Sequence, residues 1–286
     1  MWYIVLSVFC SVSVGIVLKI AKRKDINIFQ LICWNYVTAS FLSFFIFKPQ
    51  LNSSILPFEL IASLSILLPI VFFFQNSSIK YIGIVKTDIA QRLSLFIPII
   101  AAYFIFGEIF NNLKILGLVL GFNAIFFTLN KKSSLDTKRS YWYFPLLVLF
   151  GFGIIDTLLK KVASLNLISF TSLLFYIFLG ALIVSLLILF FKVAIQKERI
   201  KLTNSYWGIG VGILNFCNIL FYLKAHKVLQ SNPSTVFAGM NMGVIILGSF
   251  VGILFFNEKL TKLNYFGILL AILSIICITL SQLKTI

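Results

Sequence analysis

The chain has little of what builds a soluble domain or a disulfide framework. Only 11% of its 286 residues are charged, and the longest polar connection between apolar stretches is about ten residues. No segment is therefore long and polar enough to fold as a soluble domain. The four cysteines all fall within apolar stretches and form no CxxC pair, which argues against both a disulfide framework and a zinc site. We expect neither a metal nor a cofactor.

Residues for enzyme chemistry are also scarce. The chain has eight acidic residues and a single histidine, His226, which we predict to lie in a connection over residues 224–231 at a membrane surface. There is no HExxH, no GxSxG, no aspartate-rich magnesium motif and no glycine-rich phosphate loop. These absences argue against an enzyme, although a membrane-embedded transferase stays open as an alternative.

What the chain does contain is apolar sequence in ten separate stretches of about 15 to 25 residues. A helix needs about 20 residues to cross the hydrocarbon core of a bilayer. The first stretch lacks a preceding basic segment and a following cleavage site, so it is a span and no signal peptide. The sequence predicts an all-α integral membrane protein with ten transmembrane helices at 2–20, 27–47, 58–76, 82–106, 113–129, 141–159, 167–191, 205–223, 233–256 and 263–280.

The net charge of +16 follows the ends of these spans and does not gather on one soluble face. This distribution argues against a nucleic-acid partner. If the connections alternate between the two sides of the membrane, sixteen lysines and arginines fall on one side and seven on the other. Because basic residues prefer the cytoplasmic side, both termini are predicted to face outward. The predicted location is a cell membrane, with the bacterial inner membrane as the expected one.

The second half of the sequence repeats the first. At an offset of 150, residues 106–125 meet residues 256–275 without a gap, and an offset of 141 pairs Lys19 with Lys160. We therefore divide the chain into two five-helix repeats, 1–132 and 133–286. Five is an odd number, so equivalent helices run in opposite directions. Such inverted repeats bind their substrates near the membrane midplane, between the two halves.

Four short segments carry a resemblance to a known family. They are Phe-Gly-Glu at 106–108, Phe-Asn-Glu at 256–258, Leu-Lys-Ile-Leu-Gly at 113–117 and Leu-Asn-Tyr-Phe-Gly at 263–267. With five plus five spans, the chain resembles the two EamA-type repeats of the drug/metabolite transporter superfamily over nearly its whole length. The resemblance implies a ten-helix bundle that works by alternating access and commonly exports amino acids, other metabolites or drugs. It also implies cytoplasmic termini, opposite to the charge distribution.

Ionisable residues inside a span are costly and mark candidate sites. Arg92 lies ten residues into the fourth span, which is about 15 Å deep. Asp88 is four residues earlier on the same helix face, and their repeat equivalents are Ala238 and Met242. The pair is interpreted as a site for a carboxylate-bearing or zwitterionic solute, with a self-neutralising ion pair as the alternative.

A second candidate is Asp156 in the middle of the sixth span, where the first repeat has Gly15. This carboxylate is predicted to bind a solute amine or a coupling proton, unless it pairs with Lys160 one turn later. Lys160 and its repeat equivalent Lys19 stand at span ends. We interpret both first as snorkelling lysines, with a coupling or gating role as the alternative.

Neutral polar residues complete the candidate set. Amides inside a span can bind a solute, but they also join helices to one another. The amides near span centres are Asn123, Asn215, Asn218 and Asn241, and those nearer a span end are Asn35 and Gln91. Glu108 and Glu258, at span ends, are predicted to make helix-end or loop contacts. Pro69 and Pro98 are predicted to interrupt the third and fourth spans, with Pro98 as the better hinge candidate.

Together these features predict a secondary transporter of a small metabolite, such as an amino acid. Its expected partners are the solute and the lipid bilayer, with proton coupling left open, and it is a monomer or a homodimer. A flippase for a phosphorylated lipid carrier is the main alternative, because a basic rim can hold a phosphate headgroup.

Overall fold

The structure, a computed structural model, describes residues 1–24, 26–49, 56–128, 141, 143–165, 169–197, 201–256 and 261–283. Within these ranges, all regular secondary structure longer than one residue is α-helical. The helices are, in order, α1 (Trp2–Arg23), α2 (Ile28–Phe47), α3 (Phe58–Tyr81), α4 (Ile84–Leu93), α5 (Phe96–Phe104), α6 (Asn112–Thr128), α7 (Tyr143–Ser164), α8 (Phe170–Gln196), α9 (Thr203–Val228), α10 (Pro233–Phe256) and α11 (Lys262–Leu283).

Seven of these described helices are long and apolar enough to cross a membrane, namely α1, α2, α3, α8, α9, α10 and α11. The shorter α6, with 17 residues, is also apolar. Helix α7 coincides with the predicted sixth span but carries Asp156, Lys160 and Lys161. The prediction of an all-helical protein with several membrane-spanning segments is confirmed.

The predicted fourth span is two short helices, α4 and α5, that meet at Ser94 and Leu95. Pro98 explains the break, because proline has no N–H to donate to the carbonyl four residues earlier, at Ser94. The chain responds with tighter bonds at the junction: Leu95 N–H donates to the Arg92 carbonyl and Ile97 N–H to the Ser94 carbonyl. Pro98 thus interrupts its span as predicted. The same prediction for Pro69 is wrong, because α3 continues through this residue without a break.

Local capping explains where several helices begin. The Asn27 side chain accepts hydrogen bonds from the N–H groups of Phe29 and Gln30 at the start of α2. The Asn111 side chain accepts from Lys114 N–H at 2.8 Å in the first turn of α6. Such side chains satisfy backbone donors that a helix start leaves free, which matters more where no water is present.

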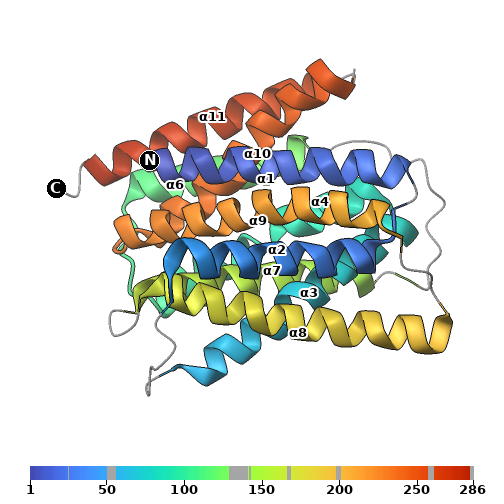
Figure 1. The fold of residues 1–286 in the computed structure, drawn as a ribbon. Helices are drawn as coiled ribbons and strands as arrows, with labels where there is room; N and C mark the ends of the chain where they lie inside the picture. Colours follow the sequence, from blue (N-terminus) through green and yellow to red (C-terminus); the bar gives the residue numbers. More distant parts are fainter. Residues whose placement is uncertain are drawn as a thin grey trace.

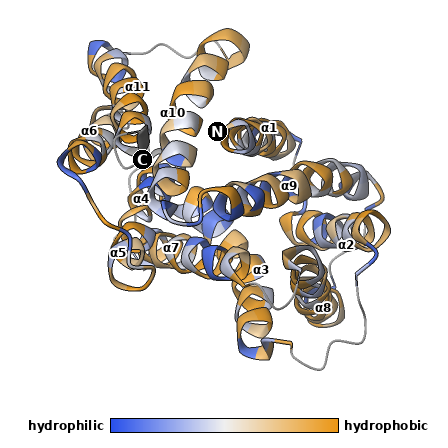
Figure 2. Ribbon diagram, turned by 90° about the vertical axis from the view of Figure 1, so that its left-hand side faces the viewer, coloured by the Kyte–Doolittle hydropathy of each residue, from blue (hydrophilic) through white to orange (hydrophobic). Residues whose placement is uncertain are grey.

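The helices lie roughly parallel, and both termini are found at the same end of the bundle (Figure 1). We call this end the terminal face and the other end the opposite face. Viewed along the helices, the outer sides are mostly hydrophobic, and hydrophilic residues occur toward the middle on α4 and α9 (Figure 2). This distribution suits a bundle with lipid outside and polar side chains inside.

Helices from the two halves of the sequence pack mainly against each other. Helix α6 contacts α11, α2 contacts α8 and α9, α1 contacts α9 and α10, and α3 contacts α7 and α8. The predicted border between residues 132 and 133 lies outside the described residues. The two halves therefore share one interior.

Close contact between α2 and α9 depends on two glycines of α9. A Cβ atom at Gly208 would lie 2.3 Å from the Trp34 Cβ atom and 2.9 Å from the Leu31 carbonyl oxygen. At Gly212 it would lie 2.8 Å from the Asn35 carbonyl oxygen. Because these neighbours are backbone or near-backbone atoms, they cannot move aside without shifting a helix. Small residues at such contacts let helices approach closely in membranes.

We expect Gly208→Ala to lower the melting temperature of the purified protein by about 3 to 10 °C, because the added methyl group overpacks the α2–α9 contact. Gly210→Ala is the matched control, since a Cβ atom there meets nothing within 4 Å. Alanine also favours the helix more than glycine does. Thermal unfolding in detergent measures both variants. Equal melting temperatures for the two would contradict this packing argument.

Candidate functional site

The first predicted pair, Asp88 and Arg92, forms in α4. Arg92 Nη2 lies 3.4 Å from Asp88 Oδ1, and the side chains are 14% and 38% exposed, respectively. The Arg92 Nε atom is buried and has no hydrogen-bond partner among the described residues. The neighbouring Gln91 accepts a hydrogen bond at 2.8 Å from Gln75 of α3. The arginine is thus only partly neutralised, and one of its donors is left for another partner.

The second predicted residue, Asp156, lies on α7 and is partly buried. Its carboxylate interacts with the Tyr222 side chain of α9. Tyr222 is only 6% exposed, and its hydroxyl makes no hydrogen bond of normal geometry with any residue that the structure describes. No cation of the described residues lies within ion-pairing distance of Asp156. The carboxylate therefore has a hydroxyl beside it and no counter-ion.

His226 corrects a prediction, because it does not lie in a surface connection. Helix α9 continues to Val228, and His226 is 0% exposed. Its ring lies 4.6 Å from the Tyr222 ring and 4.7 Å from the Phe237 ring of α10. Neither ring nitrogen of His226 has a hydrogen-bond partner in the part of the chain that the structure describes. Buried polar groups without partners are rare, so each one calls for an explanation.

The eighth predicted span ends at Leu223, where Lys224 and Lys227 follow, and this end places His226 in a connection. In the structure the Lys224 amine lies 5.7 Å from the Tyr3 ring and the Lys227 amine 5.6 Å from the Phe170 ring. Long lysine side chains can thus be accommodated on a helix that continues. The four-residue spacing of Tyr222 and His226 was the available signal that both occupy one face.

Lys160 does not pair with Asp156, which removes one of the alternatives. Its side chain is only 1% exposed, and its amine donates to the Gln230 carbonyl oxygen at 2.9 Å. It also interacts electrostatically with His226. Asp156 and Lys160 are one turn apart on α7, and Tyr222 and His226 are one turn apart on α9. The two helices thus face each other with Asp156 beside Tyr222 and Lys160 beside His226.

The equivalent lysine, Lys19, has a similar aromatic partner at the opposite face. Its amine lies 3.7 Å from the centre of the Phe256 ring, and the Lys160 amine lies 5.6 Å from that of Phe106. Phe106 and Phe256 are themselves repeat equivalents at the offset of 150. Each lysine therefore contacts a residue of the other half of the sequence. A lysine that only snorkels to the membrane surface does not need such a contact.

A further charged network lies next to Lys160 and was not among the predicted site residues. Lys114 Nζ lies 2.8 Å from Glu108 Oε1 and donates to Asn232 Oδ1 at 2.7 Å. Glu108 also accepts from the backbone N–H of Ser234 at 2.8 Å and from its hydroxyl at 2.6 Å. Glu108 thus makes the helix-end contact predicted for it, at the start of α10. Glu258 lies outside the described residues.

The predicted asparagines are not brought together. Asn123 is exposed and donates to the Val119 carbonyl of its own helix, and Asn241 likewise donates to Phe237. Asn215 joins α9 to α2 by a 3.2 Å hydrogen bond to the Asn35 side chain. Asn215 therefore joins two helices, which is the alternative to solute binding, and Asn123 does not lie in the interior of the bundle.

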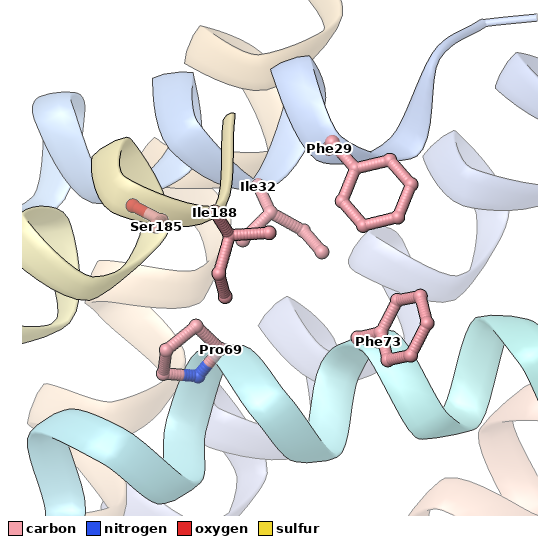
Figure 3. Close-up of a pocket in the computed structure, with 6 residues that line it drawn as sticks. All are labelled: Phe29, Ile32, Pro69, Phe73, Ser185 and Ile188. Atoms are coloured by element: carbon pink, nitrogen blue, oxygen red, sulfur yellow. The ribbon is translucent and has the colours of Figure 1, made fainter. Parts of the chain in front are cut away.

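An apolar crevice lies between α2, α3 and α8 (Figure 3). Its volume is about 10 Å³, roughly what one water molecule needs. It is therefore too small for a metabolite. The crevice is lined by Phe29, Ile32, Pro69, Phe73, Ser185 and Ile188.

Comparison with known proteins agrees with the helical architecture. Residues 1–130 and 140–280 each match the EamA-like transporter family. A protein of Haemophilus influenzae, described as uncharacterized, is 41% identical over 289 residues, which cover 96% of each chain. A solved crystal structure shares the fold with a TM-score of 0.71 at 14% identity, covering 97% of this chain and 98% of the other. With both of its halves matched, the chain belongs to the EamA-like transporter family.

Proposed function

We propose that the protein is a secondary transporter that exports a small metabolite, such as an amino acid or a related solute, across a bacterial cell membrane. The observation that carries the proposal is the Asp156 carboxylate, which has the Tyr222 hydroxyl beside it and no counter-ion among the described residues. One turn further along α9, the buried ring nitrogens of His226 lack hydrogen-bond partners among the same residues. Unsatisfied polar groups gathered inside a membrane protein are costly unless something binds there. Membership of a transporter family supports a solute as that missing partner.

The proposed site extends from α7 and α9 to α4. Asp156 would bind the ammonium group of the solute or a coupling proton, and Arg92 would bind a carboxylate. Helices α4 and α7 pack against each other, so one solute path can pass both residues. Asp88 and Gln91 would orient Arg92. Asn123, Asn215 and Asn241 are left out because their amides donate to other groups of the protein.

Alternating access between two inverted repeats is the proposed mechanism. Exchanging the two halves turns the α2–α9 contact into α8–α3, and turns α1–α9 into α7–α3. Each of these exchanged pairs is itself in contact. This reciprocity supports ten spans related by a twofold pseudo-symmetry, in which the same rearrangement can open either face.

We further propose that the terminal face is extracellular, because the lysine and arginine distribution is sixteen to seven. Lys197 ends α8 at the opposite face and Val228 ends α9 at the terminal face. In cells, a membrane-impermeant thiol reagent should label cysteine at 228 and spare cysteine at 197. The reverse result would assign the usual orientation of the family.

The function is tested in two steps with purified protein. Thermal unfolding is measured with amino acids, nucleosides, polyamines and lipid headgroups, because a ligand of the folded state raises its stability. Compounds that stabilise the protein are then tested for exchange across proteoliposomes. Exchange of a soluble solute supports the proposal. Translocation of a phosphorylated lipid carrier without solute exchange would instead identify a flippase, and chemical conversion without exchange would identify a transferase.

A further inference from the structure

Three side chains from different elements converge on the short connection between α9 and α10. Lys160 of α7 donates to the Gln230 carbonyl, and Lys114 of α6 donates to the Asn232 side chain. Glu108, between α5 and α6, accepts from the N–H and hydroxyl of Ser234. The connection is therefore tied to three separate parts of the bundle, all at the terminal face.

These ties are nearly dry. Side-chain exposure is 1% for Lys114 and 0% for Glu108, and the whole residues Lys160 and Ser234 are 1% and 0% exposed. These four residues are thus shielded from water at this end of the bundle. It is also directly joined to the proposed solute site, since α9 carries Tyr222 and His226 just before the connection. Phe237, which contacts the His226 ring, follows Ser234 by three residues on α10.

We propose that Glu108, Lys114 and Lys160 form a gate that closes the Asp156 site toward the terminal face. The gate holds the α9–α10 connection down on α6 and α7. Releasing the connection would separate Tyr222 and His226 on α9 from Asp156 on α7 at that end. The proposal deepens the proposed function and rests on it only in taking Asp156 as part of the solute site.

The chemistry of the contacts suits a gate that opens reversibly. A buried ion pair loses much of its attraction to the cost of removing both ions from water. When the connection lifts, Glu108 and Lys114 recover their hydration, which offsets the broken pair. An apolar contact in the same place would gain no such compensation, since exposing apolar surface to water is unfavourable. The closed and open forms can therefore lie close in free energy.

The opposite face is built differently at the equivalent positions. Asn264 replaces Lys114, and its amide donates to the carbonyl oxygens of Phe127 and Thr128. Lys19 replaces Lys160 and is partly exposed above the Phe256 ring. Because Asn264 carries no charge, the ion pair that Lys114 makes with Glu108 has no counterpart at position 264, and Lys19 provides a matched control for Lys160 at the opposite face.

The test measures access to a buried position and needs no solute. In a variant without the four native cysteines, Ala238→Cys reports on the site, since Ala238 is 2% exposed and follows Phe237. A membrane-impermeant thiol reagent is applied to the terminal face of proteoliposomes. Lys114→Gln and Lys160→Gln should each raise the labelling rate by about tenfold, the factor for one lost hydrogen bond to a charged group. Lys19→Gln should leave this rate unchanged.

Ser234→Ala is a milder variant that is expected to fold, because it removes only the hydroxyl contact to Glu108 and keeps the ion pair of Glu108 and Lys114. It should raise labelling by about threefold. If Lys114→Gln is not monodisperse, Ser234→Ala and Lys160→Gln decide. Unchanged labelling in these folded variants would overturn the gate, and so would an equal increase with Lys19→Gln. Loss of transport would not affect this result, so failure of the proposed function stays distinguishable.

Discussion

With Asp156 as the ligand of the solute amine, Asp156→Asn is expected to lower the initial rate of solute exchange by about a hundredfold, because truncating one partner of a buried charged contact costs several kcal/mol. The folded protein should persist, since the described residues give Asp156 no ion pair that the change would break. Exchange in proteoliposomes measures the effect. Glu59→Gln is the matched control, because Glu59 is an exposed carboxylate in the first turn of α3.

The same variant separates the two roles proposed for Asp156. If the carboxylate binds the solute amine, both exchange and accumulation driven by a proton gradient are lost. If it binds a coupling proton, exchange continues and only gradient-driven accumulation is lost. Wild-type rates in both assays would remove Asp156 from the site.

Arg92→Gln is expected to reduce exchange by roughly tenfold to a hundredfold, because it removes a charged hydrogen-bond donor to the solute. Asp88→Asn should be less harmful, since Asp88 is 38% exposed and water can replace part of its effect on Arg92. Exchange rates and elution profiles of both variants measure these effects. The order of severity follows from the difference in burial between the two partners.

The double variant Asp88→Asn/Arg92→Gln decides between a binding site and a structural pair. Replacing both members of an ion pair avoids an unpaired charge and can be close to neutral for stability. A solute site would remain inactive in the folded double variant. Near-normal exchange would show that the pair serves structure alone, and Asp156 would then carry the site without it.

The sequence was sufficient for features that depend on length, composition and periodicity. Apolar stretches predicted the helical membrane fold, and Pro98 predicted the interruption between α4 and α5. The repeat offsets also relate Lys19 to Lys160 and Phe106 to Phe256. In the structure, Lys19 contacts Phe256 and Lys160 contacts Phe106. These features are local or repeated, so a single sequence can carry them.

Contacts between distant helices were not predictable. The partner of Asp156 is Tyr222 on another helix, whereas the neighbouring Lys160 points to Gln230. Glu108 and Lys114 are close in sequence, but their burial depends on Asn232 and Ser234. The position of His226 within α9 was predicted wrongly, because the neighbouring lysines, Lys224 and Lys227, are typical of a connection between helices. In each case the deciding contact comes from a helix that the local sequence does not specify.

The sharing of one interior by both halves bears on how the protein is made. The Ser7 hydroxyl of α1 donates to the Asn218 side chain of α9 at 2.7 Å, across 211 residues of sequence. A ribosome adds about 5 to 20 residues per second, so α1 leaves it roughly 10 to 40 s before its partner. Meanwhile those polar side chains of the first half whose partners lie in the second half, such as Ser7 and Asn35, lack these partners within the bilayer. Biogenesis therefore has an interval in which the nascent chain is exposed to membrane quality control, and faster synthesis of the second half would shorten it.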